Sequence, residues 1–304
     1  MYIPEQEVRA ALTYEALIPA VRQALIDYSA GLVDQPARTI LRAGNAEGFR
    51  NGWFAVMPVV YGEVMAVKTV TFYPGNAELG LHTHMAVIEL LNRATGEPLA
   101  VMDGRVITEM RTAAVSAVAL DALAPASAAS LGILGSGVQA RSHIQAIRRV
   151  RPALKDIRIW SRTPANAERL AAETGARSVP LEEAAAADVV LTVTASPGPV
   201  LQGRWLAPHA LVLAVGATGA TLRELDDEAM QSSLIVAESR SCAQRESGDI
   251  RLSGTTVHAE IGEILAGFVP APTGRRIVFK SVGMAIEDLV GARLVWQSPA
   301  SFPK

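Results

Sequence analysis

The sequence is first informative for what it has little of. Of its 304 residues only Cys242 is a cysteine, which excludes an intrachain disulfide and a multi-cysteine zinc site. Its 28 basic residues face 30 acidic ones, so it lacks the basic excess typical of nucleic-acid binding. No apolar run reaches the roughly 20 residues of a transmembrane helix, and the N-terminus lacks the pattern of a secretory signal. We therefore expect a soluble cytoplasmic protein that binds neither nucleic acid nor membranes.

What is present points to two folded domains. Half of the residues are hydrophobic and 19% are charged, a balance that excludes intrinsic disorder. Domains typically hold about 100–200 residues, so a chain of this length favours two. Helical spacing of apolar residues predicts a helix over 13–29. Short turns then separate segments of strand character, which predicts a largely antiparallel sheet from residues 53–58, 64–73, 85–91 and 99–103.

Beyond about residue 111 strands and helices alternate, which is typical of a doubly wound parallel sheet. The predicted strands are 131–134, 157–160, 188–194, 211–215, 234–236 and 277–279. The predicted helices between them are 139–150, 165–174, 181–186 and 225–231, and an amphipathic helix over 282–294 would return to the first domain. The predicted fold class is α/β, with a Rossmann domain over 113–281. A smaller α+β domain with a mostly antiparallel sheet would comprise 1–112 and 282–304.

The strongest local motif follows the first strand of the predicted Rossmann domain. Gly135, Gly137 and Ala140 form G-x-G-x-x-A between a strand and an apolar-periodic helix. The first glycine permits a tight turn and the second lets the backbone approach a pyrophosphate at the helix N-terminus. A second strand ends 20–25 residues later, as a dinucleotide-binding unit requires. The motif therefore predicts a dinucleotide site rather than an ordinary glycine turn.

The end of that second strand indicates which dinucleotide. NAD-preferring sites usually place Asp or Glu there to bind the ribose 2′-hydroxyl. This chain reads Ser161-Arg162-Thr163, and a guanidinium with hydroxyls suits a 2′-phosphate. We expect NADPH, with NADH possible, although Arg162 as a solvated loop residue is the alternative.

Lys68 is the candidate for proton transfer. Strand alternation places it on the same face as Val64, Ala66 and Val70. A buried ammonium is costly unless it pairs or faces a cavity, and desolvation lowers its pKa toward neutrality. Such a lysine can donate or accept a proton. The alternative is a lysine that reaches outward at a sheet edge.

Two arginines and two histidines are weaker candidates. Arg111 follows Thr108, a predicted helix N-cap, and so lies near the helix N-terminus, where a cation interacts unfavourably with the helix dipole. A bound anionic ligand would offset this cost, and exposure of the side chain to solvent is the alternative that would reduce it. Arg38 can clamp a carboxylate. His82 and His84 are too few to ligate a metal, so we expect no metal site and assign them hydrogen bonds to cofactor or substrate.

Together these residues resemble a known family. Nine motifs occur in the order found in the ornithine cyclodeaminase/mu-crystallin family, at residues 35–39, 68–73, 100–104, 111–117, 135–140, 158–163, 223–228, 246–249 and 279–285. The resemblance implies a homodimer whose first domain forms the dimer contact and much of the substrate pocket. It also implies a Rossmann domain that binds the cofactor.

The resemblance also implies roles for individual residues. Arg38, Lys68 and Arg111 would be catalytic, and the substrate would be bound by Arg38, Lys68, Arg111, His82 and Thr218. The cofactor would be bound by Thr83, His84, Arg111, Gly135, Ser136, Gly137, Val138, Gln139, Ser161, Arg162, Thr163, Asn166, Thr194, Ala195, Val215 and Ser281.

One departure from the family pattern bears on the reaction. Cyclodeaminases of the family carry an essential aspartate shortly after the strand that ends here at Val215. This chain has Thr218 in that region and no carboxylate over 217–222, and a hydroxyl cannot serve as that general base. We expect a ketimine reductase that uses NADPH to reduce a cyclic ketimine carboxylate, such as piperideine-2-carboxylate or pyrroline-2-carboxylate, to the cyclic L-amino acid. Alternatives are alanine dehydrogenase-like or ornithine cyclodeaminase activity, or a non-catalytic protein that binds NADPH and a small ligand.

Overall fold

The computed structural model describes residues 1–44, 51–196 and 198–298, and it divides the chain into two compact units. Unit 1 consists of Met1–Arg111 with Met284–Lys304, and unit 2 of Thr112–Gly283. Helix α3 (Arg105–Leu123) contributes residues to both units. None of the helices in the described ranges has the length and apolar character needed to cross a membrane.

Unit 1 is built on a six-stranded sheet in the order β1-β6-β5-β4-β3-β2. All neighbouring strands are antiparallel except β1 and β6, so the prediction of a mostly antiparallel sheet is confirmed. The long central strands alternate buried and less buried side chains because one face of the sheet is covered by helices. The strands are β1 (Tyr2–Ile3), β2 (Thr39–Ala43), β3 (Gly52–Tyr61), β4 (Val64–Phe72), β5 (His84–Asn92) and β6 (Pro98–Asp103).

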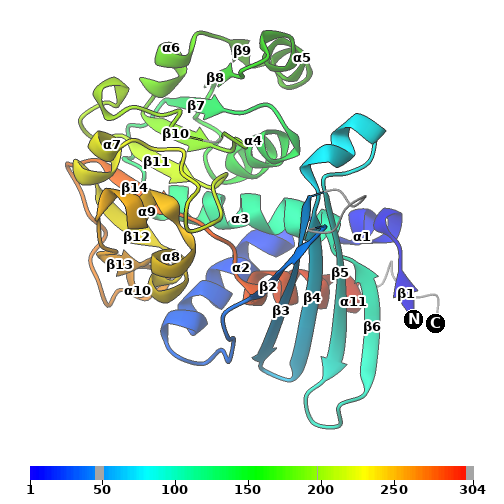
Figure 1. The fold of residues 1–304 in the computed structure, drawn as a ribbon. Helices are drawn as coiled ribbons and strands as arrows, with labels where there is room; N and C mark the ends of the chain where they lie inside the picture. The colour runs from blue at the N-terminus through cyan, green and yellow to red at the C-terminus, as the bar shows by residue number, and fades with distance from the viewer. Residues whose placement is uncertain (45–50, 197, 299–304) are drawn as a thin grey trace. The chain divides into compact units, whose positions relative to one another are not determined.

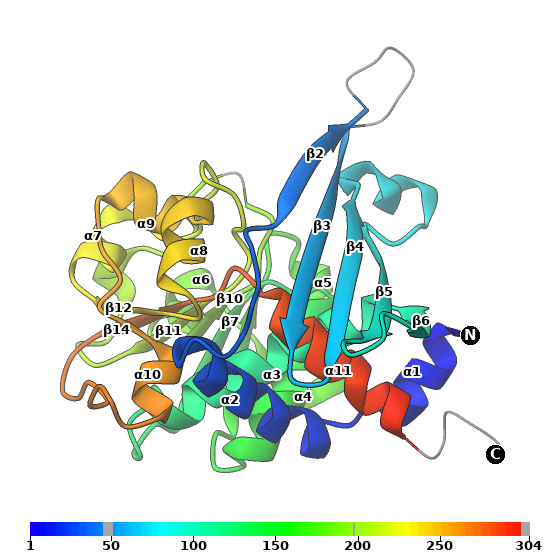
Figure 2. The ribbon, with the colours of Figure 1, turned by 90° about the horizontal axis from the view of Figure 1, so that it is seen from below.

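The α-helices that lie wholly in unit 1 come from the two ends of the chain, and a 3₁₀ helix lies between β4 and β5. They are α1 (Glu5–Ala11), α2 (Tyr14–Ser29), the 3₁₀ helix η1 (Pro74–Leu79) and α11 (Ala285–Gln297). The C-terminal helix α11 packs against α2 and against strands β3, β4 and β5 (Figure 2). The prediction that this helix is amphipathic is wrong. Its Glu287 and Asp288 are buried among apolar neighbours, and it is covered on most sides.

The start of α3 corrects a second prediction. The helix begins at Arg105 rather than after Thr108, because the side chain of Asp103 accepts hydrogen bonds from the backbone N–H groups of Arg105 at 3.0 Å and Val106 at 3.4 Å. Arg111 therefore lies in the second turn and not near N3. Its charge is compensated by carboxylates, as described below, rather than left to oppose the helix dipole.

Unit 2 has an eight-stranded sheet in the order β13-β12-β14-β11-β10-β7-β8-β9, with every neighbouring pair parallel. Helices lie on both faces of this sheet (Figure 1), as expected for a doubly wound fold. The Rossmann prediction is confirmed. Its strands are β7 (Ser130–Leu134), β8 (Asp156–Trp160), β9 (Arg177–Ser178), β10 (Val189–Thr192), β11 (Leu211–Ala214), β12 (Leu234–Ala237), β13 (Ala259–Glu260) and β14 (Ile277–Lys280).

The helices of unit 2 connect these strands and cover an apolar core. That core is formed by buried aliphatic and alanine side chains such as Leu134, Val212 and Val278. One helix starts two residues later than predicted, because Asp226 caps it by accepting from the N–H of Ala229. Besides α3, the helices are α4 (Val138–Val150), α5 (Pro164–Thr174), α6 (Leu181–Ala185), η2 (Gly203–Trp205), α7 (Asp227–Gln231), α8 (Arg240–Glu246), α9 (Gly248–Ser253) and α10 (Ile261–Leu265).

Candidate active site

Lys68 lies in the middle of β4 and is buried, with only 3% of its surface exposed. Its Nζ forms an ion pair with Asp288 Oδ2 at 2.6 Å and lies 3.5 Å from Thr108 Oγ1. Burial lowers the pKa of Lys68 to about 8, and the negative charge of Asp288 limits that fall. The alternative of an edge lysine that reaches into solvent is wrong.

Arg111 also pairs with Asp288 and, in addition, with its neighbour Glu287 on α11. Its Nη1 donates to Glu287 Oε2 at 2.6 Å, and its Nε donates to Asp288 Oδ1 at 3.1 Å. Asp288 therefore bridges Lys68 and Arg111, one through each oxygen. All four groups are at least nine-tenths buried. Because isolated buried charges are costly, this pairing fixes both cations in one geometry.

Arg38 and His84 belong to the same cluster electrostatically. The charge of Arg38 is among those that lower the pKa of Lys68. Desolvation of its ring lowers the pKa of His84 to about 4, and the charges of Lys68 and Arg111 act in the same direction. The ring is therefore neutral at neutral pH and packs against Phe72 with centroids 4.9 Å apart. We call Arg38, Lys68, His84, Arg111, Glu287 and Asp288 the cationic cluster.

Two predicted residues of unit 1 stand apart from these contacts. The His82 side chain has no hydrogen bond or ion pair within the described residues, and its carbonyl oxygen accepts from Asn76 Nδ2. The carbonyl of Thr83 accepts from the N–H of Tyr73. The structure thus brings together four of the six site residues that the sequence predicts in unit 1. Nowhere in the described ranges do three or more metal-ligating side chains gather in a way that could hold a metal ion.

The glycine turn in unit 2 has the geometry that a dinucleotide requires. Gly135 has φ +124°, and a Cβ there would lie 2.7 Å from the carbonyl oxygen of Val193. Gly137 is the N-cap of α4 and offers no side chain to the first N–H groups of the helix, and a Cβ there would meet nothing within 4 Å. The buried Gln139 Oε1 has no hydrogen-bond partner among the described residues. Open backbone donors and an unsatisfied amide oxygen fit a pyrophosphate and its ribose.

The residues predicted to bind the 2′-phosphate lie just beyond β8. Ser136 Oγ donates to Ser161 Oγ at 2.9 Å, which joins the glycine turn to the end of β8. Thr163 is the N-cap of α5, and Asn166 Oδ1 accepts from Arg169 at 3.1 Å. Arg162 is exposed and has no ion-pair partner in the part of the chain that the structure describes. Its guanidinium is thus available to an anionic ligand.

The remaining predicted residues of unit 2 follow the other central strands. Because parallel strands end at one edge of the sheet, these residues share the edge of the glycine turn. Thr194 and Ala195 follow β10, Val215 and Thr218 follow β11, and Ser281 follows β14. Thr218 is exposed and Ser281 is buried. Unit 2 therefore presents along one edge of its sheet the residues that the family resemblance assigns to the cofactor, together with Thr218, which it assigns to the substrate.

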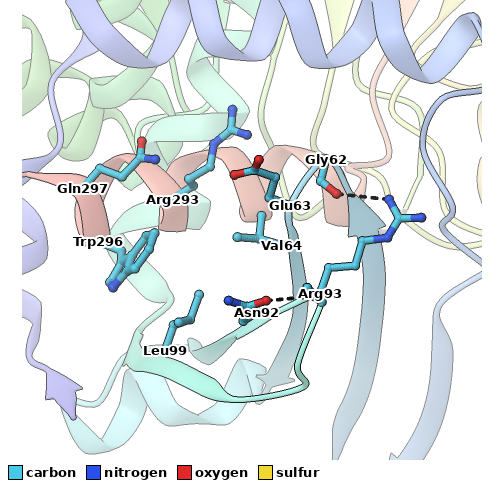
Figure 3. Close-up of a pocket in the computed structure, with 10 residues that line it drawn as sticks. Gly62, Glu63, Val64, Asn92, Arg93, Leu99, Arg293, Trp296 and Gln297 are labelled. Carbon is cyan, nitrogen blue, oxygen red and sulfur yellow. Dashed lines mark hydrogen bonds between the residues drawn. The ribbon is translucent and has the colours of Figure 1, made fainter.

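A pocket of about 690 Å³ in unit 1 contains none of the predicted site residues (Figure 3). It lies at the β3–β4 turn and the end of α11, with Val64, Leu99 and Trp296 among its lining residues. Arg93 turns its guanidinium to the carbonyl of Gly62 at 3.1 Å. No charged group in this pocket is both buried and directed into it, so we do not assign it to the site.

Sequence reasoning missed the two carboxylates that hold the cationic cluster. The sequence predicts only an amphipathic helix over 282–294 and assigns no role to Glu287 or Asp288, whereas both are buried and paired. The sequence feature that could have indicated buried carboxylates is a pair of adjacent acidic residues within a largely apolar helix. Likewise Glu224, Asp249 and Lys280 entered only as parts of family motifs, although all three are buried charges.

Comparison with known proteins bears on this arrangement. The sequence profile of the ornithine cyclodeaminase/mu-crystallin family matches residues 2–301. The ketimine reductase mu-crystallin of Mus musculus is 41% identical over 99% of this chain and 97% of its own length. The Delta(1)-pyrroline-2-carboxylate/Delta(1)-piperideine-2-carboxylate reductase of Azospirillum brasilense is 32% identical over 94% of this chain and 92% of its own.

Among solved structures, the fold is similar to that of Thermococcus litoralis Delta(1)-pyrroline-2-carboxylate reductase in complex with NADH and L-proline. The TM-score is 0.91 at 33% sequence identity, over 98% of this chain and 96% of the other. The profile match, the sequence relatives and the structural similarity all extend over nearly the whole length. This chain belongs to the ornithine cyclodeaminase/mu-crystallin family.

Proposed function

We propose that this protein is an NADPH-dependent ketimine reductase that converts a cyclic 2-imino carboxylate into the cyclic L-amino acid. The observation that carries the proposal is the buried Lys68 ammonium, paired with Asp288 at 2.6 Å beside Arg111, in a chain that also has a dinucleotide turn. One relative is named as a ketimine reductase, and another as a reductase of pyrroline-2-carboxylate and piperideine-2-carboxylate. The bound dinucleotide would supply a hydride to the imine carbon.

The charge of the cationic cluster matches such a substrate. Lys68 and Arg111 are paired with two carboxylates, Asp288 and Glu287, and Arg38 adds a further positive charge to the cluster while His84 is neutral. A substrate with one carboxylate and a neutral imine carries one negative charge. We assign the carboxylate to Arg38, because a guanidinium binds it in a bidentate manner.

Lys68 would hold the proton that the imine nitrogen acquires. Its pKa of about 8 keeps Nζ protonated at neutral pH yet allows it to release that proton. Asp288 would orient Nζ, and Arg111 would in turn be fixed by Glu287 and Asp288. Reduction then balances, because the carbon gains a hydride and the nitrogen gains the proton of Lys68. Solvent would return the proton to the lysine.

We infer a preference for NADPH from the exposed Arg162 beside Ser161 and Thr163.

We also infer a homodimer formed through unit 1, by family resemblance. A single cysteine that is buried suits a cytoplasmic enzyme. Outside the cationic cluster, His82 and Thr218 would contact the substrate, and Thr83 and Val215 would contact the cofactor.

The test is NADPH oxidation, followed by absorbance, with piperideine-2-carboxylate and pyrroline-2-carboxylate in ammonium-free buffer. We expect turnover with at least one imine and none with ornithine. Turnover that requires pyruvate and added ammonium would instead identify an alanine dehydrogenase. Release of ammonia and proline from ornithine without NADPH would identify a cyclodeaminase, for which Thr218 is unsuited. Ligand-dependent thermal stabilisation without any turnover would identify a binding protein.

A further inference from the structure

A buried carboxylate in unit 2 joins the ends of two strands that carry proposed cofactor residues. Glu224 has no exposed surface. Its Oε1 accepts from the N–H and the hydroxyl of Thr194 at 2.6 and 2.7 Å. Its Oε2 accepts from Thr192 Oγ1 at 2.8 Å and from the N–H groups of Gly216 at 2.7 Å and Ala217 at 3.2 Å. One side chain therefore ties the residues after β10 to those after β11.

A second buried pair holds the same segment from the other side. Lys280 Nζ donates to the carbonyl of Ala217 at 2.8 Å and forms an ion pair with Asp249 Oδ2 at 2.9 Å. Asp249 Oδ1 accepts from the N–H groups of Glu224 and Leu225 at 2.8 and 3.0 Å. Lys280 and Asp249 have no exposed surface. Ala217 thus has its N–H bound by one buried charge and its C=O by another.

The packing around this segment leaves no room for adjustment. A Cβ on Gly216 would lie 2.4 Å from the carbonyl oxygen of Thr194 and 2.5 Å from Glu224 Oε1. Only glycine allows the two strand ends to approach this closely. Since Val215 and Thr218 flank the clamped residues, their backbone positions depend on these bonds.

Stability alone is a poor explanation for three buried charges. Removing ions from water is costly, and well-packed apolar groups often replace a buried ion pair without loss of stability. The buried charges are better explained by their effect on backbone geometry, because each oxygen of Glu224 accepts hydrogen bonds from particular N–H groups. The strand ends that Glu224 joins are where ligands bind in open α/β sheets.

We propose that Glu224, supported by Asp249 and Lys280, is a positioning residue for hydride transfer that fixes the backbone of Thr194 and of residues 215–218. This inference rests on the proposed function and adds to it. Because Glu224 has no exposed surface, it would act through those backbone groups rather than through contact with substrate or cofactor. Misplacing them would disturb the chemical step, while the glycine turn and Arg162 would still bind the phosphates.

The test is Glu224→Gln, with Asp226→Asn as the matched control. Glutamine keeps the size, but its NH2 group must face either the N–H of Thr194 or those of Gly216 and Ala217. Asp226 lies two residues away, contacts neither strand end, and caps α7 by accepting from Ala229 and Gly203. Asparagine is an equally good cap, so this control should keep wild-type behaviour.

For Glu224→Gln we expect kcat to fall about tenfold or more while the Kd of NADPH, measured by fluorescence, changes less than about threefold. Amide hydrogen exchange of residues 215–218 in the ligand-free protein should speed up by about tenfold or more. A wild-type kcat per NADPH-binding site would overturn the proposal, whether or not hydrogen exchange of the segment has changed. Wild-type protein that reduces no cyclic imine would instead refute the proposed function, and the exchange measurement would still decide whether Glu224 fixes the segment.

If Glu224→Gln does not fold, Glu224→Asp provides the same comparison. It keeps the charge, but its shorter side chain cannot reach both strand ends. A purely structural role would lower the melting temperature and the fraction that binds NADPH while leaving kcat per binding site unchanged. The positioning role predicts a lower kcat per binding site, and a wild-type value would contradict it.

Discussion

The pKa of Lys68 gives the most specific prediction for the cationic cluster. Asp288 is the negative charge that limits the fall of this pKa, and it lies 2.6 Å from Nζ. An opposite charge at such a distance typically shifts a pKa by about 1–3 units, each worth about 1.4 kcal/mol. Asp288→Asn preserves the size of the side chain and removes the charge. The pKa of Lys68 should therefore fall from about 8 to roughly 5–7.

The consequence for activity follows from the sign of that change. If protonated Lys68 donates to the imine, kcat/KM falls as the pH rises through its pKa. In Asp288→Asn this decline should begin about 1–3 pH units lower than in the wild type. The imine has its own protonation step, but that step is the same for every variant. The difference between the variants therefore reports Lys68.

Glu287→Gln is the matched control for this experiment. It lies next to Asp288 on the same helix, is equally buried and pairs with Arg111 rather than Lys68. We expect it to shift the decline by much less than Asp288→Asn does. Loss of one buried partner can cost about 3–5 kcal/mol, so thermal unfolding must first establish that both variants fold. A folded Asp288→Asn protein with the wild-type pH profile would refute the assignment of the proton to Lys68.

Two further predictions concern the cofactor. Gly135→Ala and Gly137→Ala should both weaken NADPH binding about tenfold or more. Only Gly135→Ala should also lower the melting temperature, because only Gly135 of the two has a positive φ and a close backbone neighbour. Equal melting temperatures of the two variants would contradict this interpretation. Arg162→Ala should raise the KM for NADPH by about 10–100-fold and leave that for NADH within about twofold, since it removes a charged contact to the 2′-phosphate. Equal effects on both dinucleotides in steady-state assays would mean that Arg162 is only a solvated residue.

The fold was predictable where local patterns determine it. The alternation in β4 placed Lys68 on the buried face, and the spacing of Gly135 and Gly137 between strand and helix identified the dinucleotide turn. Such features depend on neighbouring residues in the sequence. The two-residue strand β1 was not predictable in the same way. It exists through its pairing with β6, and the paired residues Tyr2 and Val101 are far apart in the sequence.

The partners in the site depend on tertiary contacts that sequence patterns do not encode. Arg111 and Asp288 are 177 residues apart in the chain, so nothing local shows that one neutralises the other. Because Asp288 cannot be identified as its partner from the sequence, the charge of Arg111 can be considered there only in relation to the helix dipole, and the predicted start of that helix is wrong. The N-cap error had a local cause, since both Asp103 and Thr108 are good capping residues and the earlier one is used.

If this protein is a ketimine reductase, hydride reaches the imine carbon of a cyclic substrate bound to it. The most direct measurement uses NADPH that carries deuterium at the transferable position of the nicotinamide, with mass spectrometry of the cyclic amino acid formed from piperideine-2-carboxylate or pyrroline-2-carboxylate. We predict one deuterium at C2 of an L-product and none elsewhere. A product without deuterium, or unchanged imine after all NADPH sites are filled, would contradict the account.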